Sequence, residues 1–213
     1  MNILEHISKL LAPISNPVVV ELGACNGDDT RQIIAVLPKP FSYFAWEPSA
    51  EMYDRLCPQM RDNMRSLGVT FVPKAVAAVD GLIRFWQSND LYCGSSSIRK
   101  PAETLTWWPD MRFEERMVEA QTLDSFAAEH ALCRIDFIWA DIQGAEADMI
   151  EGGRNILART RYLYTEFSDH ELYEGEIGLN EIINRLPGRW WIVEKWDTNG
   201  YADVLLRNMD FIG

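Results

Sequence analysis

Long apolar runs are absent from this chain of 213 residues. No segment approaches the roughly 18 consecutive apolar residues that a membrane-spanning helix requires. The N-terminus also lacks a basic stretch followed by an apolar stretch and a cleavage site, which is the pattern of a secretory signal. We therefore expect a cytoplasmic protein that has no membrane partner.

Positive charge is also scarce, because 20 Lys and Arg residues stand against 32 Asp and Glu residues and give a net charge of −12. A nucleic-acid surface needs clustered Lys and Arg, so no nucleic-acid partner is expected. The four cysteines (Cys25, Cys57, Cys93 and Cys133) form no CxxC pair, which argues against a zinc site or a disulfide framework. Repeats and linkers are absent too. Residues 1–213 are therefore expected to form one domain, and a homo-oligomer stays open.

What the chain does contain is an alternation of buried strands and amphipathic helices. Strands are predicted at residues 17–22, 41–46, 69–72, 135–140, 162–167, 190–195 and 202–206. Helices are predicted at residues 2–12, 28–37, 50–67, 122–130, 145–157 and 179–186. This order implies an α/β fold, with a single doubly wound Rossmann-like domain whose mostly parallel seven-stranded sheet carries helices on both faces. The first helix lies within an N-terminal segment, residues 1–15.

Three segments depart from this alternation. Residues 75–86 predict a hairpin-like pair that turns at Asp80-Gly81. Pro58 should kink or divide the helix at residues 50–67. Residues 88–115 show no periodicity, and a loop of that length is usually a functional lid or disordered. Its aromatic residues, Trp107 and Trp108 among them, favour a lid, with Ser95–Ser97 as hydroxyl donors or simply as part of a solvated loop.

A glycine-rich turn follows the first predicted strand. Glu21 ends that strand, and Gly23, Asn26 and Gly27 follow. Gly23 would let the backbone turn sharply and let a ligand approach the main chain. The spacing differs from the G-x-G-x-x-G fingerprint, which disfavours a nicotinamide cofactor. Two purely structural glycines in a strand-to-helix turn would explain the pattern nearly as well.

Glu47 ends the second predicted strand, where doubly wound folds place a carboxylate on ribose hydroxyls. A solvated acid at a strand end is the alternative. Taken together with the glycine-rich turn, Glu47 predicts a nucleotide-type pocket. We add Pro48 and Ala75 to the predicted cofactor-binding residues.

Three further side chains are candidates for chemistry. Asp141 ends the buried run Phe137-Ile138-Trp139-Ala140, at the edge where parallel sheets bind ligands. Glu166 ends the next strand, and His170 lies four residues beyond it. Asp141 would contact a cofactor, orient an acceptor or bind a metal, and His170 suits proton removal near neutral pH. A histidine on a surface loop is the alternative for His170, and Glu146 is read first as a helix-terminal acid.

These segments resemble the FkbM-type family of S-adenosylmethionine-dependent methyltransferases, from about residue 18 to about residue 206. The most specific segment is residues 135–153. There the matching positions are Ile135, Asp136, Asp141, Gly144, Ala145, Glu146 and Gly152. The chain departs from the family at Trp139, where Lys is frequent, and at Gln143, where Glu is frequent. Roles of those two side chains cannot be carried over.

The resemblance implies an O-methyltransferase that uses S-adenosyl-L-methionine and acts on a hydroxyl of a sugar or of a small glycosylated metabolite. Asp141, Glu166 and His170 are the predicted catalytic residues, and Asp141 also contributes to the cofactor site. Two alternatives stay open. One is a metal-assisted methyltransferase in which Asp141 and Glu166 bind Mg²⁺, a less favoured cofactor. The other is a nucleotide-binding module of the same fold that lost the reaction.

Overall fold

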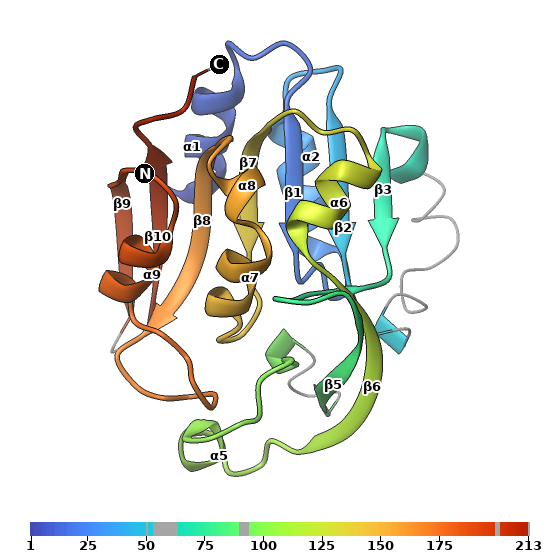
Figure 1. Cartoon of the computed structure of the whole chain (residues 1–213), viewed down its shortest axis with the longest axis vertical. Coiled ribbons are helices and arrows are strands. Elements are labelled where there is room, and N and C mark those ends of the chain that lie inside the picture. The colour runs from blue at the N-terminus through green and yellow to red at the C-terminus, as the bar shows by residue number, and fades with distance from the viewer. Residues whose placement is uncertain (50, 53–63, 90–93, 199–200, 213) are drawn as a thin grey trace.

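The computed structural model describes residues 1–49, 51–52, 64–89, 94–198 and 201–212. Its main sheet has seven strands in the order β3-β2-β1-β7-β8-β10-β9 (Figure 1). The strands are β1 (Val18–Leu22), β2 (Ser42–Trp46), β3 (Val69–Val72), β7 (Ile135–Ala140), β8 (Thr160–Ser168), β9 (Trp190–Thr198) and β10 (Tyr201–Asn208). Only β10 runs antiparallel to its neighbours among these strands. The predicted fold class is confirmed.

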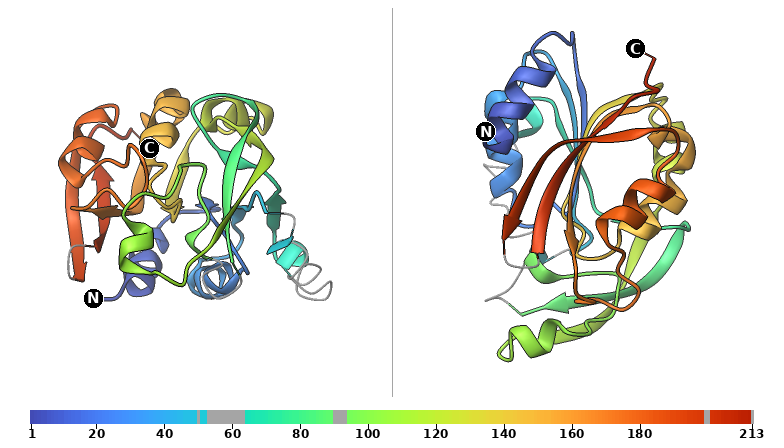
Figure 2. Two further views of the ribbon diagram at one scale, coloured as in Figure 1. Left: turned by 90° about the horizontal axis from the view of Figure 1, so that it is seen from below. Right: turned by 90° about the vertical axis from the view of Figure 1, so that its left-hand side faces the viewer.

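Helices cover both faces of this sheet (Figure 2). They are α1 (Ile3–Leu11), α2 (Asp28–Val36), α6 (Leu123–Glu129), α7 (Glu146–Gly152), α8 (Arg154–Leu157) and α9 (Leu179–Arg185). Successive strand residues point to opposite faces. Val19 and Phe137 therefore pack with α1 and α2, whereas Val20 and Ile138 pack with α6 to α9. Burial on both faces explains why these strands read as continuous apolar runs.

A second sheet of three strands lies beyond the carboxyl ends of the main sheet (Figure 1). Its order is β4-β6-β5, with β4 (Ala75–Val76), β5 (Gly81–Ser88) and β6 (Phe113–Gln121). The predicted hairpin over residues 75–86 is wrong, because β6 lies between β4 and β5 and pairs with both. The side chains of β6 are exposed or half-buried over most of its length. Its sequence therefore carries little apolar alternation.

The segment predicted as a lid, residues 88–115, is partly regular. It contains α5 (Thr104–Trp107) and the first residues of β6, and Ser97 forms a bridge with Trp86. Lid closure stays a prediction. Residues 51–52 and 64–66 are helical as expected, whereas the kink at Pro58 lies outside the described residues. None of the described helices is long and apolar enough to cross a membrane.

Gly152, the last residue of α7, lets this helix approach the small sheet. A Cβ at this position would stand 2.1 Å from the carbonyl oxygen of Ala77, which follows β4, and 3.2 Å from the Cβ of Thr122, which precedes α6. The end of α7 therefore contacts the backbone of the small sheet directly. Any side chain at this position would push α7 away from the small sheet.

Gly152→Ala should lower the free energy of unfolding by about 1–3 kcal/mol, the usual cost of overpacking. Helix propensity alone predicts the opposite sign, a gain of about 1 kcal/mol. Gly94→Ala is the control, because a Cβ there would meet nothing within 4 Å. Urea denaturation of the three proteins measures the difference, and a stabilised Gly152→Ala protein would contradict this packing.

Candidate functional site

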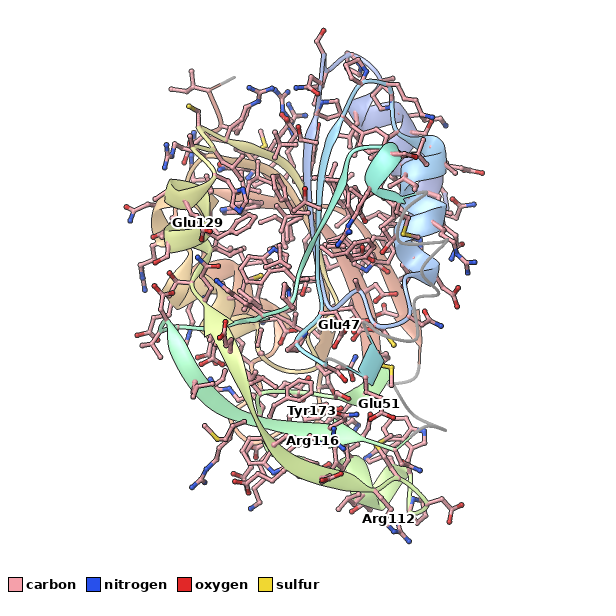
Figure 3. The ribbon with its side chains drawn as sticks, turned by 90° about the vertical axis from the view of Figure 1, so that its right-hand side faces the viewer. Glu47, Glu51, Arg112, Arg116, Glu129 and Tyr173 are labelled. Carbon is pink, nitrogen blue, oxygen red and sulfur yellow. The ribbon has the colours of Figure 1, made fainter. Side chains whose placement is uncertain are left out.

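The candidate site is a cavity at the carboxyl ends of β1, β2 and β7, where the predicted cofactor-binding residues gather. It encloses about 510 Å³ of empty space, part of it open to solvent. Five of the predicted cofactor-binding residues line it, namely Gly23, Glu47, Pro48, Ala75 and Asp141. Figure 3 shows Glu47 where the main sheet ends and the small sheet begins.

Gly23 holds the three strand ends together. Its φ is +90°, and a Cβ here would stand 2.0 Å from the carbonyl oxygen of Asp141. The N–H of Asp141 donates to the carbonyl of Leu22, and the N–H of Gly23 donates to that of Trp46, both at 3.0 Å. Gly23 therefore allows β1, β2 and β7 to meet. This contact is a stronger requirement for glycine than the ligand clearance expected from sequence.

Glu47 is buried at the cavity wall with 7% of its surface exposed. Its Oε2 accepts the N–H of Cys25 at 2.9 Å, and its Oε1 accepts the N–H of Ser49 at 2.8 Å. Burial raises the pKa of Glu47 to about 7, although these two hydrogen bonds act to lower it. The alternative of a solvated acid at a strand end is wrong. Glu47 fixes the loop after β1, and each oxygen keeps a lone pair for a ligand.

Glu21, Asn26 and Gly27 lie behind this wall and do not line the cavity. Glu21 is fully buried, and its Oε2 accepts the hydroxyls of Thr30 at 2.6 Å and Tyr43 at 2.9 Å. Burial raises the pKa of Glu21 to about 7. The Oδ1 of Asn26 accepts the N–H of Asp28, which begins α2. The contacts of Glu21 and Asn26 hold the turn and the start of α2.

Asp141 and Glu166 meet at the edge of the cavity through Gln143. The Nε2 of Gln143 donates to Oδ1 of Asp141 at 2.6 Å and to Oε2 of Glu166 at 2.8 Å. Burial raises the pKa of both carboxyls, and the Asp141 charge raises that of Glu166 further. The two acids also hydrogen-bond to each other. Such a pair holds a proton that isolated surface carboxyls would release.

The structure does not bring His170 into this pair. Its Nδ1 lies 3.7 Å from Oε2 of Glu103, and its ring centroid lies 4.7 Å from that of Trp107 in α5. The N–H of His170 donates to the Oγ of Ser168, which turns the chain away after β8. His170 therefore contacts α5, a partner that the unpatterned sequence before β6 could not indicate.

Three cavity residues, Lys74, Phe85 and Ile98, were not predicted. The position of Lys74 directly before Ala75 was an available signal for it. Ser96 and Ser97 also line the cavity, where the lid interpretation of the triple serine expected hydroxyl donors. Phe85 and Ile98 come from the small sheet and its connection, whose topology was not predicted.

Trp139 and Gln143, the two residues that differ from the family pattern, have different roles in the structure. Trp139 is 8% exposed and its ring centroid lies 4.3 Å from that of Tyr164, so it is a packing residue. Gln143 donates to both acids proposed as Mg²⁺ ligands. Within the described residues, no three His, Cys, Asp or Glu side chains group so that they could hold a metal ion.

Glu146 is an unusual buried acid at the start of α7. It is 1% exposed, and neither carboxyl oxygen has a hydrogen-bond partner of good geometry in the described part of the chain. Burial raises its pKa to about 8, and the charges of Glu176 and Asp141 add to this effect. Glu146 is therefore protonated in the folded protein at neutral pH. Glu146 is a buried packing residue, and the charge of Asp141 in the site helps to keep it protonated.

Glu146→Gln should change how stability depends on pH. The folded pKa lies above the unfolded value, so the folded state holds a proton that the unfolded chain releases between about pH 4.5 and pH 8. The contribution of Glu146 is complete below that window and declines as pH rises through it. The variant should match the wild type near pH 5 and exceed it by roughly 1 kcal/mol or more near pH 9. Glu151→Gln, an exposed acid on the same helix, is the control. Equal differences at both pH values in urea denaturation would contradict a buried, protonated Glu146.

Comparison with solved structures shows how widely this fold occurs. An rRNA methylase from Streptococcus thermophilus matches with a TM-score of 0.55 and 12% identity, covering 96% of this chain and 93% of that one. The N-terminal domain of EvdMO1, solved in the presence of SAH and D-fucose, matches with a TM-score of 0.52 and 10% identity. That match covers 96% of this chain and 81% of the other. At such identities these matches establish the fold alone.

Sequence comparison is more specific. The chain is 37% identical over 203 residues to the 2-O-methyltransferase NoeI of Sinorhizobium fredii (strain NBRC 101917 / NGR234), which covers 91% of this chain and 80% of NoeI. Residues 21–211 match the methyltransferase FkbM domain. The predicted enzyme class is confirmed, and a module without catalytic activity is disfavoured. The chain belongs to the FkbM family of methyltransferases.

Proposed function

We propose that this protein transfers a methyl group from S-adenosyl-L-methionine to a hydroxyl of a sugar or of a small glycosylated metabolite. The observation that carries the proposal is the Asp141–Glu166 pair at the edge of the cavity. The name of NoeI, a 2-O-methyltransferase, supports a hydroxyl acceptor, and the D-fucose named with EvdMO1 supports a sugar. The likeness to rRNA methylases is one of fold only. The net charge of −12 still favours a small acceptor over a nucleic acid.

The cavity wall suits S-adenosylmethionine on chemical grounds. Glu47 offers two oxygens at the end of β2, where a carboxylate binds ribose hydroxyls in folds of this type. Gly23 and Ala145 leave the backbone accessible, and Ile98 and Phe85 supply apolar contacts for a base. When bound, the cofactor supplies a methyl group that is already activated for transfer.

The contribution of the protein is then to align the acceptor oxygen and to take up its proton. Asp141 lies both on the cavity wall and beside Glu166. In its ionised form Asp141 accepts a hydrogen bond from the acceptor hydroxyl and receives the proton as the oxygen is methylated. Before the transfer, the protonated Glu166 donates a hydrogen bond to the ionised Asp141 and stabilises its charge; after the transfer, each carboxyl holds one proton. No role is assigned to His170, because its contacts lie with α5.

Glu47→Gln should weaken the binding of S-adenosylhomocysteine by about 1.5–3 kcal/mol, the range for a hydrogen bond to a charged group. The amide keeps the size of the side chain but loses one acceptor. Isothermal titration calorimetry measures the change, and Glu194→Gln on the edge strand β9 is the control. Unchanged affinity would show that Glu47 does not bind the cofactor.

Asp141→Asn should lower turnover by about 100-fold or more, because the amide keeps the shape but cannot accept the proton. A coupled assay for S-adenosylhomocysteine, with a panel of methyl glycosides that includes methyl D-fucoside, measures the rate. Asp197→Asn on β9, where the side chain is 68% exposed, is the control. Full activity in Asp141→Asn would show that the active centre lies elsewhere. Loss of wild-type activity in EDTA with recovery in Mg²⁺ would favour the metal-assisted alternative.

A further inference from the structure

Gln143 occupies a constrained position between the two acids of the site. Its φ is +51°, in the left-handed region that side chains other than glycine rarely adopt. Its Nε2 lies 2.6 Å from Oδ1 of Asp141 and 2.8 Å from Oε2 of Glu166. Both amide hydrogens are therefore directed to carboxylates from two different strands. A strained backbone that positions one side chain is common at functional sites.

The rest of Gln143 is anchored to the segment that lines the cavity. The Oγ of Ser97 donates to the main-chain carbonyl of Gln143 at 2.7 Å. The Tyr173 hydroxyl lies 3.2 Å from Oε1 of Gln143 and 2.7 Å from the carbonyl of Ser95. These contacts leave one orientation of the amide, with its oxygen toward Tyr173 and its nitrogen toward the acids. Figure 3 shows Tyr173 below Glu47, where the two sheets meet.

The surroundings make this amide important for the charge of the pair. Titratable groups from several elements face Asp141 or Glu166, and most are acids. They are Glu21, Asp29, Glu47, Glu146, Tyr164, Tyr173, Tyr201 and Asp203. This environment favours the protonated form of Asp141, in which it cannot accept a proton. The amide donors of Gln143 act in the opposite direction.

We infer that Gln143 is a positioning residue that joins Asp141 and Glu166 into one hydrogen-bonded unit and keeps Asp141 available as a proton acceptor. The inference rests on the proposed methyl transfer to a hydroxyl. The acceptor oxygen would bond to the methyl carbon as the bond from that carbon to the cofactor sulfur breaks, its electron pair staying on the sulfur, and Asp141 would receive the proton of the acceptor hydroxyl. Gln143 does not line the cavity and acts through the two carboxyls.

Replacing the amide without changing its length tests this role. Gln143→Met removes both donors, so Asp141 should hold its proton to higher pH. The acidic limb of the rate profile should move up by about one pH unit or more, the equivalent of a hydrogen bond to a charged group. Because the pKa of Asp141 is about 6, turnover should fall about tenfold near pH 5 and about twofold near pH 7 and recover at higher pH, while the KM for S-adenosylmethionine changes less than twofold. Asn155→Leu is the matched control, since Asn155 is an exposed amide that also donates to an acid, Asp124, and neither residue lines the cavity.

A second measurement does not depend on turnover. Carbon NMR of labelled carboxyl groups should show the Asp141 titration moving upward by the same amount in Gln143→Met, with S-adenosylhomocysteine bound. Gln143→Glu, which keeps the shape but adds a third acid, should move it upward further. This variant serves the same comparison if Gln143→Met does not fold.

Wild-type titration and a wild-type rate profile in the Gln143 variants would overturn the inference. A loss of turnover by the same factor at every pH would also overturn it, because only packing would then be involved. A wild-type protein that methylates none of the methyl glycosides would count against the proposed function instead. The carboxyl titration would still decide the role of Gln143 in that case.

Discussion

The approach of two backbones at Gly23 is the constraint on which the rest of the structure depends. A single Cβ there would stand 2.0 Å from the Asp141 carbonyl oxygen. The N–H groups of Gly23 and Ala24 both donate to the carbonyl of Trp46, so the same turn also determines where β2 ends. Asp141 and Glu47 reach a common cavity because β1, β7 and β2 meet at this residue. No side-chain interaction could replace a contact made by main-chain atoms.

The second constraint is the cost of keeping acids in the interior. Glu21, Glu47, Asp141, Glu146 and Glu166 all have raised pKa values, and burial is the first cause in each case. Hydrogen bonds from backbone N–H groups, hydroxyls and the Gln143 amide offset part of that cost. An isolated ionised carboxylate would not persist in such surroundings. The protein therefore concentrates acids with raised pKa values at the carboxyl edge of its sheet.

The sequence predicted the fold and the site residues correctly where local patterns mark buried strands. It failed to predict contacts that join distant segments of the chain. The order of strands and helices, Gly23, Glu47 and Asp141 follow from strands that end at one edge. The hairpin was wrong because β6, which separates β4 from β5, is too exposed to carry a clear pattern. Gln143 reaches Glu166 over 23 positions from a left-handed backbone. Neither that backbone conformation nor that contact leaves a signal in a single sequence.

The central place of β7 in the main sheet also governs how the chain folds. The N–H of Val18 donates to Asp136 across 118 positions in the sequence. Closing so long a loop costs entropy before any contact compensates for it, and parallel sheets of this kind form slowly. The N-terminal strands β1, β2 and β3 can pair with one another first, but they cannot build the cavity without β7. Ligand binding therefore becomes possible only late in folding, and a nascent chain that ends before β7 has no site to occupy.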